Sequence, residues 1–265
     1  MNYTRTHTLY TGLAGFLLSF FLFGCGSGSD QMAKPTPVGT ADKLFTDGKA
    51  AYAKEDWPEA IRLFEEVRVQ SPASNIAAEA TYFEAMARFN SDMFSGAALD
   101  FHTVRRNYPN SPYASRAQYM AGESYYQISP RPDLDQSYTT LALSEYQIFL
   151  RDYPKAPPSL IDSAQKRIID IRSKLAEKFI LAAQLYDKLD DPKSSLVYYN
   201  RVLDSYYDTR YAPESELRIA EIQFDRKKME EAKQALDAFD AKYLREATTD
   251  QRQRALKLRS KLPNQ

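Results

Sequence analysis

Apolar residues recur along this chain with one fixed spacing, which predicts a series of helices. A small residue is followed four and seven positions later by large apolar residues, and in three of five copies a proline stands five positions further on. Positions 0, 4 and 7 share one face of an α-helix, so each copy must bury that face against a neighbour. The proline ends the helix because it cannot continue the hydrogen-bond pattern. The copies begin at Ala60, Ala97, Ala142, Ser195 and Ala232.

A second set of small residues precedes the first and predicts a partner helix for each copy. These residues are Gly48, Ala85, Gly122, Ala183 and Ala220. Gly48, Ala85 and Gly122 follow one another at steps of 37 residues, and so do Ala183 and Ala220. The pattern resembles the tetratricopeptide signature, a helix-turn-helix unit of about 34 residues. We therefore expect an all-α solenoid of five tetratricopeptide-like helical hairpins.

Two insertions interrupt the repeat. Between Gly122 and Ala142 the gap is 20 residues instead of 12, and the proline-rich run at 129–133 is the expected place of the extra loop. Ala142 and Ser195 are 53 residues apart, 16 more than one repeat. Between Ile161 and Leu189 apolar residues alternate at steps of four and three, which predicts one continuous helix of about 25 residues and about 40 Å. We expect this long helix to join the third hairpin to the fourth.

The N-terminus has the features of a secretory signal. The apolar run from Leu13 to Phe23 is too short to span a bilayer as a helix. It leads into Leu22-Phe23-Gly24-Cys25, which resembles a bacterial lipobox, and Cys25 is the only cysteine of the chain. We expect cleavage before Cys25 and acylation of it; the alternative is an ordinary signal peptide with an unrelated cysteine. The next residue is Gly26 and not Asp, which by the rule for such lipoproteins favours the outer membrane, with the domain facing the periplasm.

The chain therefore divides into four predicted parts. Residues 1–24 are a lipoprotein signal peptide, and residues 25–40 are a lipidated cysteine with a flexible tether rich in Gly, Ser and Pro. Residues 41–160 hold hairpins 1–3. Residues 161–265 hold the long helix, hairpins 4–5 and a polar capping helix from Thr249 to Leu262. Contact with the membrane is expected only through the N-terminal lipid.

Composition argues against several classes of protein. The chain has 35 basic and 35 acidic residues, so nothing indicates a nucleic-acid partner. Only one of the two histidines, His102, follows the signal peptide, and no second His or cysteine accompanies it there. We find no nucleophile with a base, no metal-ligand spacing and no phosphate-binding loop. We expect no catalytic residues, no metal and no cofactor, and hence no enzyme.

Some repeat positions depart from the pattern. A tyrosine precedes the closing proline at Tyr108 and Tyr153, and we expect it to pack toward the next hairpin. The first hairpin has Ser71 at this position, and the last two have Tyr207 and Leu244 where the proline would stand. These positions are structural, so the departures leave the expected fold unchanged.

Several segments together resemble the BamD family, lipoproteins of the outer-membrane β-barrel assembly machinery. They are the lipobox, the long helix after three hairpins, Leu134-Asp135-Gln136, Ala142 to Pro154, and Tyr198 to Thr209. The resemblance implies a scaffold whose C-terminal hairpins bind the last POTRA domain of a BamA-type barrel protein. It also implies that the N-terminal hairpins receive unfolded outer-membrane protein precursors, and that accessory assembly lipoproteins are further possible partners.

The resemblance implies particular site residues. Arg201 aligns with a family arginine that contacts the BamA domain, and Asn200 is its neighbour in the same motif. For precursor binding we expect Tyr52, Tyr82 and Tyr119, because an extended strand with an aromatic end needs apolar slots and a few polar groups.

Two other classes of protein remain open. One is a different periplasmic tetratricopeptide adaptor, serving envelope constriction or pilus and secretin assembly, which shares the Tyr-Pro-x-Ser-x-Tyr-Ala motif. The other is a lipid-anchored enzyme or solute-binding protein. The regular repeat and the lack of catalytic residues stand against the second class.

Overall fold

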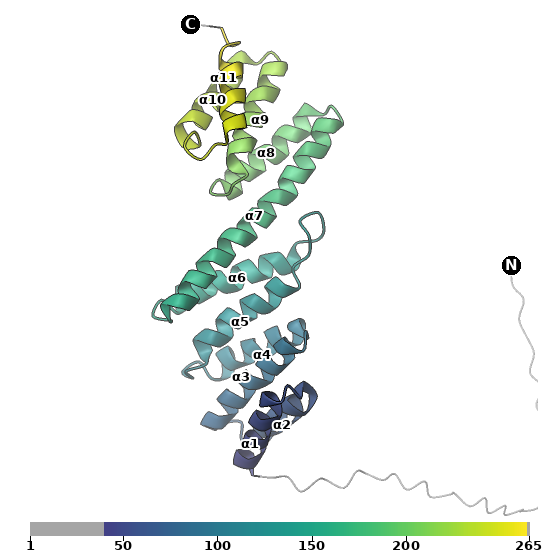
Figure 1. The fold of residues 1–265 in the computed structure, drawn as a ribbon, viewed down its shortest axis with the longest axis vertical. Helices are drawn as coiled ribbons and strands as arrows, with labels where there is room; N and C mark the ends of the chain where they lie inside the picture. Colours follow the sequence, from purple (N-terminus) through teal and green to yellow (C-terminus); the bar gives the residue numbers. More distant parts are fainter. Residues whose placement is uncertain (1–39, 264–265) are drawn as a thin grey trace, which may run out of the picture. The chain divides into compact units, whose positions relative to one another are not determined.

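The computed structural model describes residues 40–263, which hold eleven α-helices and no strand (Figure 1). Cys25, the predicted signal peptide and most of the predicted tether lie outside these residues. The helices are α1 (Ala41–Ala53), α2 (Trp57–Gln70), α3 (Asn75–Asn90), α4 (Phe94–Asn107), α5 (Ala114–Gln127), α6 (Ser137–Asp152), α7 (Pro158–Lys188), α8 (Pro192–Tyr206), α9 (Ala212–Asp225), α10 (Met229–Lys242) and α11 (Thr249–Arg259).

The helices pair in chain order, which confirms the predicted solenoid. The pairs α1 with α2, α3 with α4, α5 with α6, α7 with α8 and α9 with α10 form five hairpins, and the second helix of each packs on the first helix of the next. In Figure 1 the helices follow one another from α1 at the lower end of the stack to α11 at the upper end. Each hairpin therefore buries its apolar stripe against both its partner helix and its neighbours.

The small residues of the first helices let the two helices of a hairpin approach closely. A Cβ atom built on Gly48 would lie 2.8 Å from Cε1 of Phe64, and one on Gly122 would lie 2.9 Å from Cε1 of Tyr146. Both rings are fully buried. The aromatic residue of the second helix thus fills the space that a side chain on the first helix would need, which explains why small residues recur at these positions of the first helices.

Four hairpins turn in the same way. Glu55, Asp92, Asp190 and Lys227 each adopt a left-handed conformation, with φ between 54° and 63°, just before the second helix begins. The third hairpin instead has the predicted insertion, a loop between α5 and α6. Lys174 and Lys178 of α7 hold this loop, because their Nζ atoms donate to the backbone oxygens of Ser129, at 3.1 Å, and Leu134, at 2.7 Å.

The long helix α7 is present and has 31 residues, more than the 25 expected. It begins at Pro158, before the apolar stripe starts, because proline fits the first turn of a helix, where no hydrogen-bond donor is required. Its first half buries Ile171 and Leu175 in the core of hairpin 3, and its second half buries Ile180 and Ala183 in the core of hairpins 4 and 5. One helix therefore contributes to two apolar cores.

The last helix, α11, occupies the place of a further repeat. Ala255, Leu258 and Leu262 are buried, as the sequence predicts. Gln251 donates to a carboxylate oxygen of Glu214 at 2.9 Å across 37 residues, which is one repeat. Arg254 also lies 2.9 Å from a carboxylate oxygen of Glu214. Helix α11 thus covers α9 as the first helix of an incomplete sixth hairpin, which supports the predicted capping role.

Candidate functional site

The three tyrosines predicted to bind precursors lie in three different apolar clusters. Tyr52 packs in the core of hairpin 1, Tyr82 in that of hairpin 2 and Tyr119 against that of hairpin 3. Tyr82 is only 9% exposed. Tyr52 and Tyr82 both pack on Phe83, with ring centroids 5.4 Å and 5.8 Å from it, whereas Tyr119 belongs to a different cluster. The structure therefore does not bring all three side chains together, and Tyr82 contributes mainly to packing.

Tyr52 is half-buried, like Tyr119, and belongs to an aromatic group formed by α1, α2 and α3. Its ring centroid lies 5.2 Å from that of Trp57 and 5.4 Å from that of Phe83, and its hydroxyl accepts a hydrogen bond from Asn90 at 2.9 Å. The Nζ atom of Lys49 lies 5.3 Å above the rings of both Phe45 and Phe83. Aromatic faces and a cation thus share one surface of hairpins 1 and 2.

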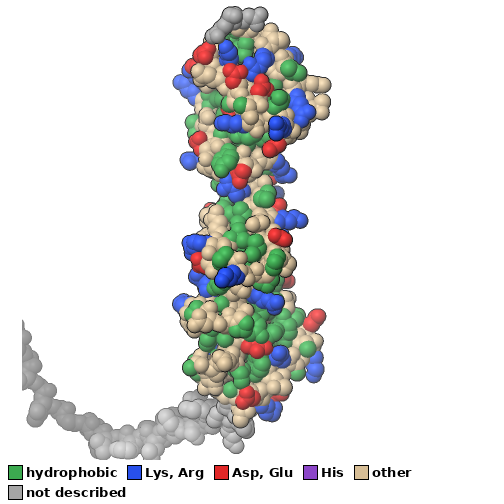
Figure 2. Space-filling model, turned by 90° about the vertical axis from the view of Figure 1, so that its left-hand side faces the viewer, with side chains coloured by type: hydrophobic (Ala, Val, Ile, Leu, Met, Phe, Trp, Pro, Cys, Tyr) green, Lys and Arg blue, Asp and Glu red, His purple; other side chains and the backbone are tan. Residues whose placement is uncertain are grey.

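On one face of the molecule, hydrophobic side chains are more prominent over the N-terminal hairpins (Figure 2). Figure 2 shows green side chains gathered over the lower hairpins on the face drawn, whereas acidic and basic side chains mix over the C-terminal end. At that end Arg218 and Arg254 pair with Glu221 at 2.6 Å and 2.9 Å. On the face drawn in Figure 2, the N-terminal hairpins therefore present apolar side chains to solvent.

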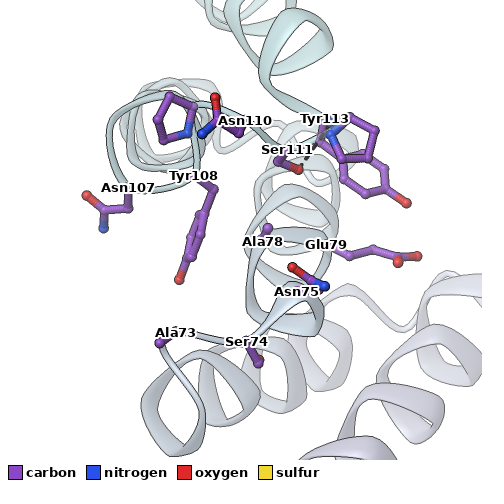
Figure 3. A pocket seen from close by; sticks show the side chains of 12 residues that line it. Ala73, Ser74, Asn75, Ala78, Glu79, Asn107, Tyr108, Asn110, Ser111 and Tyr113 are labelled. Carbon is purple, nitrogen blue, oxygen red and sulfur yellow. Dashed lines mark hydrogen bonds between the residues drawn. The ribbon is translucent and has the colours of Figure 1, made fainter.

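A pocket of about 560 Å³ opens between two loops of this N-terminal part (Figure 3). It lies between the α2–α3 loop, the first turns of α3 and the α4–α5 loop. The side chains that line it are mostly amides, hydroxyls and aromatic rings, with one carboxylate: Ala73, Ser74, Asn75, Ala78, Glu79, Asn107, Tyr108, Pro109, Asn110, Ser111, Pro112 and Tyr113. Tyr113 stacks on Tyr82 with ring centroids 4.9 Å apart. Tyr82, one of the tyrosines predicted to bind precursors, therefore supports the wall of this pocket.

The sequence interpretation missed this pocket, although its Tyr-Pro-x-Ser-x-Tyr motif forms one wall. We expected Tyr108 to pack toward the next hairpin, and that prediction is wrong. Its hydroxyl donates to the backbone oxygen of Pro72 at 2.9 Å, in the loop that precedes hairpin 2. The side chain points backward because the carbonyl of that earlier loop offers a partner, and this contact could not be read from helical spacing.

Tyr119 belongs to a buried polar network that joins α5, α6 and α7. Its hydroxyl and that of Tyr146 both donate to Oε1 of Glu123, at 2.9 Å and 2.5 Å, and Arg167 donates at 2.8 Å. Burial alone would raise the pKa of Glu123, but the bonds from Arg167, Tyr146 and Tyr119 lower it. Burial and the adjacent carboxylate raise the pKa of Tyr119 to about 12. The Tyr119 hydroxyl is therefore bound to the carboxylate through which Arg167 joins α5 to α7.

Arg201 lies on the outer face of α8 and is exposed to solvent. Within residues 40–263 its guanidinium group makes no hydrogen bond or ion pair. Val197, one helical turn earlier on the same side of α8, is 65% exposed, and Tyr207 at the end of the helix is 63% exposed. The neighbouring Asn200 is also exposed, but its amide donates to the backbone oxygen of Leu196 at 2.7 Å. A cation without an internal partner beside apolar residues is a common composition for a binding surface.

No arrangement for catalysis is visible in the described part of the chain. Residues 40–263 contain no group of three or more His, Cys, Asp or Glu side chains placed to hold a metal ion. His102 is half-buried, and its Nε2 lies 3.5 Å from a carboxylate oxygen of Glu145. Burial lowers the pKa of His102. Across the same residues, no helix combines the length and the apolar character that a membrane span requires.

Comparisons with known proteins identify the family of this chain. Residues 37–238 match the family model described as YfiO, outer membrane lipoprotein. A protein of Rickettsia prowazekii (strain Madrid E), described as outer membrane protein assembly factor BamD, is 24% identical over 77% of this chain and 80% of its own length. BamD of Vibrio cholerae is 25% identical over 78% of this chain and 87% of its own length. A solved tetratricopeptide protein of Thermus thermophilus aligns with a TM-score of 0.35 and 16% identity, over 83% of this chain and 99% of its own. Because the family model covers most of the sequence, the chain belongs to the YfiO family of outer membrane lipoproteins, the family of BamD.

Proposed function

We propose that this protein is a scaffold in the assembly of outer-membrane β-barrel proteins. Its C-terminal hairpins bind a POTRA domain of a BamA-type barrel protein, and its N-terminal hairpins receive unfolded precursors. Relatives named as outer membrane protein assembly factors support the general role. The observation that carries the partner assignment is the exposed Arg201 on α8, which has no partner within residues 40–263.

The surface around Arg201 suits a folded protein partner better than a small molecule. It lies on the second helix of a hairpin and presents a guanidinium group one helical turn from the exposed Val197. Arginine binds carboxylates through two parallel hydrogen bonds, and nearby apolar side chains exclude water from such a pair. An acidic residue on the partner domain is the expected counterpart. Asn200 supplies a second polar group at the edge of this surface.

The N-terminal hairpins have the chemistry that an extended precursor needs. The aromatic group around Tyr52 and Lys49 offers apolar faces, and the amide-lined pocket nearby offers hydrogen-bond donors and acceptors for a peptide backbone. Tyr82 and Tyr119 act in this proposal through packing, since Tyr82 supports Tyr113 at the pocket wall and the ring of Tyr119 packs on Tyr146 and Phe149 of α6.

A pull-down of the tagged, lipidated protein from its own envelope in mild detergent tests this function. We expect a BamA-type barrel protein with POTRA repeats as the main partner, with unfolded β-barrel precursors as minor ones. A secretin or peptidoglycan-linked proteins as the main partners would replace the assembly role by the adaptor role. If the pull-down recovered the BamA-type partner but no precursors, only the proposed binding of precursors by the N-terminal hairpins would be withdrawn.

A lipid on Cys25 is proposed to hold the protein at the periplasmic face of the outer membrane. The replacement Cys25→Ser removes the thiol that acylation needs, so we expect the protein to move from the membrane fraction to the soluble periplasmic fraction. Fractionation followed by immunoblotting measures this, with Cys25 intact as the control. Continued sedimentation with membranes would mean that protein contacts, and not acyl chains, provide the attachment.

A further inference from the structure

Hairpin 4 has an apolar face that no part of residues 40–263 covers. Leu181, Leu185 and Leu189 follow one another at steps of four along α7 and are 41%, 54% and 64% exposed. Steps of four place side chains on one side of a helix, so the three leucines form one stripe. We call these three residues the leucine stripe.

The repeat shows what normally covers these positions. Leu185 corresponds to Ala87 in hairpin 2, Ser124 in hairpin 3 and Ile222 in hairpin 5. Those residues are 0%, 0% and 6% exposed, because the second helix of the preceding hairpin packs on them. Leu181 likewise corresponds to Phe83, which packs into the core of hairpin 1. The leucine stripe is therefore a hairpin-stacking surface.

The long helix explains why this surface is open. The first half of α7 packs on hairpin 3 through Ile171 and Leu175, and Lys178 marks the end of that contact by bonding to the α5–α6 loop. Beyond it the helix continues toward α8, past the edge of hairpin 3 (Figure 1). A cleft of about 750 Å³ lies at this point, lined by Lys178 and the start of α6, including Leu141. The 16 extra residues have thus moved hairpin 4 away from its usual neighbour.

The other open end of the stack provides a matched comparison. Hairpin 1 also has no preceding hairpin, and its equivalent positions are Thr46, Ala50 and Lys54, all exposed. There the sequence has small or polar residues, as expected of a surface that faces water. At hairpin 4 the same positions are three leucines. Leucines at a stacking position indicate a surface that is covered in the assembled state.

We infer that the leucine stripe binds an amphipathic α-helix of a partner protein. The occupant is a helix because a helix covers the equivalent positions of hairpins 2, 3 and 5. It presents apolar residues at steps of three and four toward α7 and takes the place of the missing second helix of a preceding hairpin. This contact is separate from the surface around Arg201 and does not depend on it.

Site-specific photo-crosslinking tests the inference in the full-length, lipidated protein in its own membrane. p-Benzoylphenylalanine replaces Leu181, Leu185 or Leu189 in turn, and replaces Ala50 as the matched control. We expect all three positions to crosslink to one partner, at residues that advance along it by three or four, as on a helix. Ala50 should give less than a tenth of that yield.

The variant Leu185→Glu provides the second measurement. It should lower the crosslinking yield from position 189 at least tenfold and leave the thermal unfolding midpoint of the purified protein unchanged, since the side chain is already half exposed. Four results would each overturn the inference. They are crosslinks that advance by two residues along the partner, crosslinks to hairpin 3 of the same chain, reaction with lipid alone, and equal yields at Ala50 and Leu185. If the pull-down recovered no BamA-type protein, the proposed function would be contradicted, but the crosslinking result for the leucine stripe would still stand.

Discussion

Replacing Arg201 by Glu is expected to reduce recovery of the BamA-type partner at least tenfold in the mild-detergent pull-down. Truncating one member of a desolvated interface charge pair costs about 2–5 kcal/mol, and a tenfold loss of affinity needs only about 1.4 kcal/mol. Charge reversal adds repulsion of the partner carboxylate to this loss. The helical content should not change, because Arg201 is exposed and makes no contact that stabilises residues 40–263.

A charge reversal elsewhere on the same helix is the matched control for Arg201→Glu. Lys193 is also exposed on α8, two turns earlier, so Lys193→Glu changes the net charge of the protein by the same amount. Partner recovery should stay near that of the unaltered protein. If Arg201→Glu recovers the partner as well as the unaltered chain does, the proposed interface is wrong. An equal loss in both variants would point to net charge and not to a specific contact.

Replacing Glu123 by Ala is expected to destabilise the protein by about 3–5 kcal/mol, the usual cost of removing one member of a buried ion pair. Glu123 is 7% exposed and accepts hydrogen bonds from Tyr119, Tyr146 and Arg167. Its loss leaves two hydroxyl groups and a guanidinium group without their acceptor between hairpin 3 and α7. For a chain of this size the thermal unfolding midpoint should fall by about 10 °C, measured by circular dichroism.

The exposed ion pair between Glu59 and Arg62 on α2 provides the control for Glu123→Ala. Glu59→Ala should change stability by less than about 1 kcal/mol, because solvent screens such pairs. Acid titration gives a second check. The pKa of Glu123 is lower in the folded state, so its stabilising contribution is present above the pKa of the unfolded chain, near 4.5, and is lost as the pH falls through the folded value. A Glu123→Ala variant with an unchanged midpoint and unchanged acid sensitivity would contradict the role of this network.

Burial of the predicted tyrosines changes the surface that we propose for precursor binding. Aromatic residues at helical spacing pack in the core more often than they bind a ligand, and Tyr82 and Tyr119 pack in this way here. The accessible chemistry lies at Tyr52 with Lys49, and in the loop pocket beside Tyr113. A precursor would therefore meet the edge of the first two hairpins and not a continuous row of tyrosines.

The sequence by itself determined the helices and their pairing, because helical periodicity is local. The step of 37 residues located the small residues of the first helices, Gly48 and Gly122 among them, and it located both insertions. Side-chain direction relative to a single helix also follows from spacing: Arg201 stands two positions past the buried Tyr199, and it is exposed.

Only the tertiary structure decided which surfaces are covered, because burial depends on neighbours that are distant in the sequence. Spacing marked Tyr108 as a packing residue, but the carbonyl of Pro72 decided the direction in which it packs. The same period of apolar residues runs through α7, yet Ile171 is buried and Leu185 is half exposed. The difference arises because hairpin 3 ends where Lys178 meets its loop, and no local pattern records where a neighbouring hairpin ends.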